Sequence, residues 1–123
     1  MQIPIHLLLA FIACAATSAR AAEAPEQLFT LTIVRGALPA AHRLLKVEKG
    51  DALRLHIISD APGALHLHGY RLAAQLVADQ PAELAFKAYA TGRYSLEWHG
   101  DDKTANAGAH RGPPLAILEV RPK

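Results

Sequence analysis

The 123-residue chain has one cysteine and one methionine, and both lie near its start, as Cys14 and Met1. The sequence after Cys14 therefore offers no thiol and no thioether, which excludes disulfide bonds and thiolate–metal centres there. Aromatic residues make up 6% of the chain, the formal net charge is +2, and no basic stripe is present. Nucleic-acid binding therefore has no support in the sequence. Stability must come from a hydrophobic core.

Only the N-terminal segment carries a long apolar run. Residues 3–16 are almost wholly apolar, but a helix needs about 20 such residues to cross a bilayer. Small residues follow, including Ala-Arg-Ala at 19–21, which is typical of a cleavage site. We therefore predict a signal peptide at residues 1–21 and one exported, periplasmic domain at residues 22–123. A retained membrane anchor and a lipoprotein acylated at Cys14 are the alternatives.

Short stretches of alternating hydrophobicity fill the rest of the chain. In the stretch 28–34, Phe29, Leu31 and Ile33 share one face, while threonines occupy the other. This period of two is typical of half-buried β-strands. The pattern predicts about eight short strands, separated by Gly, Pro and Asp turns, and it favours an antiparallel β-sandwich or Greek-key barrel. The other expected strands are 42–47, 52–59, 64–68, 71–77, 82–88, 93–98 and 115–120.

Two histidines in the strand expected at 64–68 suggest a metal site. Residues i and i+2 of a strand point to the same face, so His66 and His68 emerge together. Leu65 and Leu67 point the other way, into the core. Such a strand presents two imidazoles to one ion, and Gly69 after it marks a bulge or corner. A polar surface without a bound metal is the alternative interpretation of the pair.

The order of several motifs resembles the cupredoxin family. The resemblance covers about residues 28–121 and implies an all-β, cupredoxin-like Greek-key β-sandwich of about eight strands. Small exported members of this family are most similar. The matching segments are Val-Glu-Lys-Gly-Asp at 47–51, His-Leu-His-Gly-Tyr at 66–70, Pro-Ala-Glu-Leu at 81–84, Thr-Gly-Arg-Tyr at 91–94, Glu-Trp-His-Gly at 97–100 and Gly-Pro-Pro-Leu at 112–115.

The residues that form a blue-copper site in cupredoxins are missing here. Such a site binds copper through two histidines, one cysteine and a weak axial methionine. The resemblance places the cysteine position at Trp98 and the first histidine position near Gly63 or Ala64. The loop that would supply the methionine, at 109–114, has none. A blue-copper electron carrier is therefore excluded, and the resemblance implies a site made of histidines alone.

We expect this site to hold copper. The resemblance implies that the loop 100–114 folds over the metal end of the domain and brings His110 toward the other histidines. Imidazole suits Cu(II) and Zn(II), and a site without thiol favours these over Cu(I). Cu(II) is the first choice and zinc the second, and Asp101 or Asp102 would orient an imidazole by hydrogen bonding. The expected metal ligands are His66, His68, His99 and His110.

The remaining candidates have ordinary structural roles. We expect His42 and His56 to lie on the surface and Trp98 to pack in the core. Tyr70 and Tyr94 should pack as well. No nucleophile motif and no phosphate-binding glycine loop is present, so we predict no catalytic residues and no enzymatic activity.

The sequence predicts an exported metal-binding protein that serves metal sequestration, delivery or tolerance. Its partners would be the metal ion and a periplasmic or membrane protein, and no small-molecule substrate is evident. The main alternative is a metal-free, cupredoxin-like interaction module of the periplasm. A small mononuclear copper oxidase is a further alternative.

Overall fold

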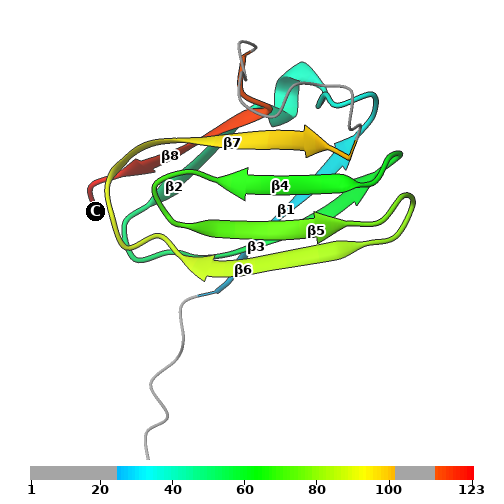
Figure 1. Cartoon of the computed structure of the whole chain (residues 1–123). Helices are drawn as coiled ribbons and strands as arrows, with labels where there is room; N and C mark the ends of the chain where they lie inside the picture. Colours follow the sequence, from blue (N-terminus) through cyan, green and yellow to red (C-terminus); the bar gives the residue numbers. More distant parts are fainter. Residues whose placement is uncertain (1–24, 102–112) are drawn as a thin grey trace, which may run out of the picture.

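The computed structural model describes residues 25–101 and 113–123, which form eight β-strands and one short 3-10 helix, η1 (Figure 1). Residues 1–21, where a signal peptide is predicted, lie outside the described residues. Within the described ranges no helix is long and apolar enough to span a membrane. The elements are β1 (Gln27–Ile33), η1 (Ala40–His42), β2 (Leu44–Glu48), β3 (Ala52–Ser59), β4 (Gly63–Leu67), β5 (Leu72–Leu76), β6 (Ala82–Lys87), β7 (Gly92–Gly100) and β8 (Ala116–Arg121).

The strands form two sheets packed face to face, which confirms the predicted β-sandwich. One sheet has three strands in the order β1-β3-β6, and the other has five in the order β2-β8-β7-β4-β5. Two pairs depart from the expected antiparallel arrangement, because β1 pairs with β3 and β2 with β8 in parallel. Alternating hydrophobicity specifies which side chains point inward, but it does not specify the direction of the neighbouring strand. The chain changes sheets between β1 and β2, and each of these strands forms a sheet edge.

Leucine and isoleucine side chains from both sheets fill the space between them. Leu31 and Ile33 of β1 are buried as predicted, with Phe29 packed against this core. Leu65 and Leu67 of β4 are 0% and 1% exposed, which confirms their predicted inward orientation. Burying an aliphatic side chain of this size stabilises a fold by about 1.5–3 kcal/mol. The core therefore fixes which residues of β4 point outward.

Strand β7 is longer than predicted and continues to Gly100. His99, which was expected at the end of this strand, lies within it. Leu96 of β7 is fully buried, so Glu97 and His99 alternate with inward-facing residues on the strand. The extra length adds backbone pairing with β4, where Gly63 lies opposite Gly100.

The indole of Trp98 packs against two glycines at one end of the sandwich. A methyl group on Gly63 would overlap the carbonyl oxygen of His99 and lie 2.5 Å from Cη2 of Trp98. A methyl group on Gly36 would lie 3.1 Å from Cδ1 of the same ring. Trp98 is thus packed against the core, as predicted. Close approach of the indole to the backbone requires glycine at position 63.

We predict that Gly63→Ala lowers the free energy of unfolding by about 2 kcal/mol, because overpacking at a rigid contact costs about 1–3 kcal/mol. The neighbouring variant Gly100→Ala is the control, since its new methyl group would meet only Nε1 of Trp98 at 3.9 Å. It should change stability by less than about 0.5 kcal/mol. Urea denaturation measures both, and equal effects would contradict the packing described.

Candidate metal centre

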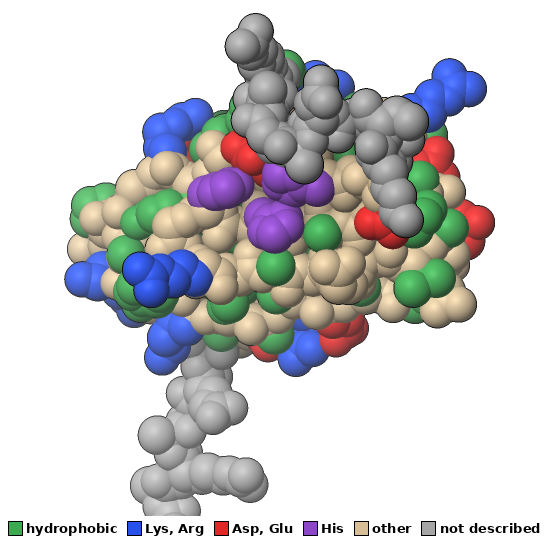
Figure 2. Space-filling model, viewed as in Figure 1, with side chains coloured by type: hydrophobic (Ala, Val, Ile, Leu, Met, Phe, Trp, Pro, Cys, Tyr) green, Lys and Arg blue, Asp and Glu red, His purple; other side chains and the backbone are tan. Residues whose placement is uncertain are grey.

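Histidine side chains gather on the outer face of the five-stranded sheet, over β4 and β7 (Figure 2). Strands β4 and β7 are antiparallel neighbours, and their register places His66 opposite Glu97 and Ala64 opposite His99. Side chains of opposed residues emerge on the same face of a sheet. The buried leucines of both strands therefore force the imidazoles and the Glu97 carboxylate outward together.

His68 joins this group from the corner that follows β4. Its backbone N–H donates a hydrogen bond to the carbonyl oxygen of Ser95 over 3.0 Å, which continues the β4–β7 ladder one residue beyond the strand. Ser95 precedes Glu97 by two positions on β7, so the ladder brings His68 alongside that carboxylate. The sequence-based expectation that His66 and His68 emerge together holds for their rings, whose centroids lie 6.4 Å apart.

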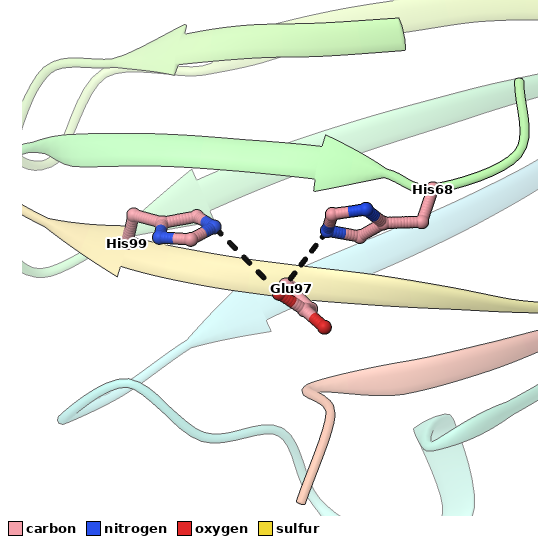
Figure 3. Close-up of side chains that lie close together, drawn as sticks. All are labelled: His68, Glu97 and His99. Carbon is pink, nitrogen blue, oxygen red and sulfur yellow. Dashed lines mark ion pairs between the residues drawn. The ribbon is translucent and has the colours of Figure 1, made fainter. Parts of the chain in front are cut away.

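Three side chains place their donor atoms together. Oε2 of Glu97 lies 3.1 Å from Nε2 of His68 and 3.8 Å from Nε2 of His99 (Figure 3). All three donor atoms lie within 4.8 Å of one another. Two ligands bound at about 2.1 Å to one ion lie about 3.4 Å apart in a tetrahedral site and at most about 4.2 Å apart, so rotations of the imidazole side chains must bring the donors somewhat closer together. The arrangement therefore suits one divalent ion.

His66 lies beside this group and not within it. Its ring packs edge-on against His99, with centroids 4.7 Å apart and planes at 81°. It is half-buried and directly opposite Glu97 on the neighbouring strand. His66 thus packs against the His99 ring from outside the three-donor group. His110, the fourth expected ligand, lies outside the described residues.

Glu97 is the site residue that sequence reasoning missed. We expected Asp101 or Asp102 to accompany the histidines, but Asp101 instead lines a hollow with Trp98 and Pro62 at the end of the sandwich, and Asp102 lies outside the described residues. The signal for Glu97 was present, because it stands two residues before His99 and shares its strand face.

The carboxylate of Glu97 differs from that of Glu83 in its partners. In the described part of the chain, its only ion pairs are with His68 and His99. Glu83, on the other sheet, instead binds Nη1 of Arg54 over 2.6 Å, and this hydrogen bond lowers the pKa of Glu83. No arginine or lysine of the described residues neutralises Glu97 in this way, so its charge is available to a cation.

The two other described histidines lie elsewhere on the surface, as predicted. His56 is on the three-stranded sheet, with Nδ1 3.6 Å from Oε1 of Glu83. His42 is exposed at the end of η1. Neither approaches the group on β4 and β7, so both serve as controls for effects of histidine removal.

The site is chemically suited to borderline divalent metals. Two imidazole nitrogens and one carboxylate oxygen bind Cu(II), Zn(II) and Fe(II), whereas Cu(I) prefers sulfur. The described residues contain no cysteine and no methionine. The side chains of Glu97 and His99 are 28% and 30% exposed, and that of His68 is 55% exposed. An ion bound here would keep contact with solvent on the His68 side.

Trp98 occupies the position at which the resemblance to blue-copper proteins expects a thiolate, and Gly63 is one of the two residues near which it expects an imidazole. In this structure they pack on each other at the end of the sandwich. The donor group lies instead on the outer face of the sheet, with its side chains directed away from the core.

No protein-family profile and no curated protein sequence matches the chain, but solved structures do. A copper binding protein, solved in its apo form by NMR, is 12% identical with a TM-score of 0.58, over 81% of this chain and 92% of that protein. A multicopper oxidase is 19% identical with a TM-score of 0.59, over 80% of this chain and 43% of the oxidase. The blue copper oxidase of Nitrosomonas europaea is 16% identical with a TM-score of 0.57, over 80% of this chain and 40% of the enzyme.

These similarities show the fold. The chain is a cupredoxin-like β-sandwich, as its motifs predicted. It spans less than half the length of the two oxidases.

We predict that the site residues contribute little to folding. Glu97→Gln removes a half-exposed charge, and exposed ion pairs stabilise proteins by about 0–1 kcal/mol, so the free energy of unfolding should change by less than about 1 kcal/mol. Leu96→Ala, one residue earlier but fully buried, should cost about 2–5 kcal/mol. Chemical denaturation of both variants checks this. A large loss for Glu97→Gln would assign the carboxylate a structural role.

Proposed function

We propose that this protein binds copper through His68, Glu97 and His99, and that it serves metal sequestration, delivery or tolerance in the periplasm. The observation that carries the proposal is the convergence of three donor atoms within 4.8 Å on one sheet face. His66 is available as an additional nitrogen donor. Cu(II) is the preferred ion and Zn(II) the competing one.

The chemistry of the donors supports Cu(II). Among divalent first-row metals, nitrogen and oxygen sites bind Cu(II) most tightly. The carboxylate of Glu97 adds a negative charge beside the two imidazoles, and within the described residues no arginine or lysine forms an ion pair with it. One structural neighbour of similar length is a copper binding protein, which agrees with this choice.

The openness of the site supports a role in holding and exchanging metal. Structural metal sites are closed by four protein ligands, whereas open sites retain positions for water or another ligand. Here three donors converge on an outer sheet face and the His68 side chain is 55% exposed. An incoming ligand from a partner can reach the ion from that side, which suits delivery.

Removal of a donor should weaken copper binding. Calorimetric titration of the purified protein with Cu(II) should give one ion per chain. His68→Ala and His99→Ala each remove one of three donors and should each raise the Kd at least about tenfold, since even loss of a residue that only orients a ligand costs about 10–100-fold. His56→Ala, on the other sheet, should bind like the parent.

Two outcomes would contradict the proposal. One is the absence of stoichiometric Cu(II) binding, which would favour the metal-free interaction module. The other is undiminished binding in His68→Ala and His99→Ala.

Fluorescence of Trp98, the only tryptophan of the chain, provides a second readout of binding. Trp98 adjoins His99, so a paramagnetic ion bound there should quench the tryptophan fluorescence.

The structure also predicts a rank order among the histidines. His66 lies outside the three-donor group and contacts it through the His99 ring. His66→Ala should therefore raise the Kd for Cu(II) less than His68→Ala does. Parallel titrations of the two variants measure this. The reverse order would mean that His66 is the principal donor and that the side chains rearrange on binding.

A further inference from the structure

His68 is the one donor of the group that no strand carries. Glu97 and His99 lie within β7, where Glu97 pairs with His66 and His99 with Ala64 of β4. His68 instead begins the corner between β4 and β5. The reach of its imidazole to Glu97 therefore depends on what holds that corner in place.

The backbone of the corner lies directly on the ring of Tyr94. Gly69 has φ +86° and Arg71 has φ +53°, both in the left-handed region. A methyl group on Gly69 would lie 2.5 Å from Cδ1 and 2.8 Å from Cε1 of Tyr94. Glycine is required at position 69 for two reasons: its positive φ disfavours other residues, and a side chain there would overlap the ring of Tyr94. Tyr94 belongs to β7, so the corner is seated on the strand that supplies the other two donors.

The side chain of Tyr70 holds the corner in place from the core side of the sheet. It is 6% exposed and packs edge-on against Tyr94, with ring centroids 4.7 Å apart. Its hydroxyl donates a hydrogen bond to the carbonyl oxygen of Ala90 over 2.9 Å and accepts one from the Ala90 N–H over 3.3 Å. Tyr70, two residues after His68, thus links the corner by hydrogen bonds to the loop that contains Ala90.

We propose that Gly69 and Tyr70 are positioning residues of the metal site: they hold the corner so that Nε2 of His68 stays 3.1 Å from Oε2 of Glu97. This inference rests on the proposed function. The corner adds His68 to the two donors on β7. Because it holds the His68 side chain in place, this donor loses less conformational freedom when it binds the ion. Metal affinity is accordingly set by residues that do not touch the ion.

A glycine substitution tests the proposal. Gly69→Ala strains the backbone and overlaps Tyr94, so the corner and His68 should shift. The Kd for Cu(II) should rise about tenfold, and the electron paramagnetic resonance spectrum should lose a nitrogen coupling, as in His68→Ala. Gly50→Ala is the matched control, since Gly50 has φ +96° but no atom within 4 Å of the added methyl group. It should carry similar backbone strain and bind copper like the parent.

A double variant separates positioning from general destabilisation. If Gly69 acts through His68, adding Gly69→Ala to His68→Ala should raise the Kd by no more than about twofold further, since the two changes remove the same interaction. A further tenfold rise in the Kd would overturn the proposal.

Tyr70→Phe provides a milder variant, because it retains the ring and removes only the hydrogen bonds to Ala90. It should raise the Kd for Cu(II) about threefold.

A measurement without metal distinguishes this inference from the proposed function. In the metal-free parent, imidazole protons of His68 and His99 should show a nuclear Overhauser effect, because a ring nitrogen of each lies within 4.8 Å of a ring nitrogen of the other. The effect should persist in Gly50→Ala and vanish in Gly69→Ala. If the parent binds no copper, the proposed function fails while this result still supports the corner. If folded Gly69→Ala retains the nuclear Overhauser effect, the proposal that the corner positions His68 is wrong.

Discussion

The pairing of β4 with β7 is the interaction on which the donor group depends. The antiparallel register places His66 opposite Glu97, and its last hydrogen bond, from the N–H of His68 to Ser95, brings a further imidazole to the same face. The leucines of both strands secure that register, because a slip of one residue would expose them and bury the donors. The same burial that stabilises the sandwich thus determines which side chains can meet a metal ion.

The location of the donor group differs from that of a blue-copper centre. The end of the sandwich, where the resemblance to blue-copper proteins expects a buried thiolate centre, holds the indole of Trp98 packed on Gly63. The donors lie instead on an outer sheet face, with the His68 side chain half-exposed. A buried centre suits electron transfer at a fixed geometry, whereas an open face suits binding and exchange of an ion. His68 is exposed, but the corner that carries it, between β4 and β5, is held in place by contacts of Tyr70 and Tyr94 inside the fold.

Local patterns were sufficient to predict the strands, the inward leucines and the β-sandwich, since each depends on the period of two along a single segment. That rule also placed His66 and His68 on one face. The same rule places Glu97 beside His99, whereas the sequence prediction named the acidic pair after the strand, Asp101 and Asp102, instead. The distances within the group could not be predicted, because they depend on the register between segments about 30 residues apart in the chain. The two parallel strand pairs were missed for the same reason, since direction and neighbour are properties of the whole sheet.

The most direct test of the account is the position of copper in a crystal of the protein, located by anomalous scattering at the copper absorption edge. The account predicts one strong peak on the outer face of the five-stranded sheet, about 2.0–2.2 Å from Nε2 of His68, Nε2 of His99 and Oε2 of Glu97. A peak at the Trp98 end of the sandwich, or none near these three side chains at full loading, would contradict it.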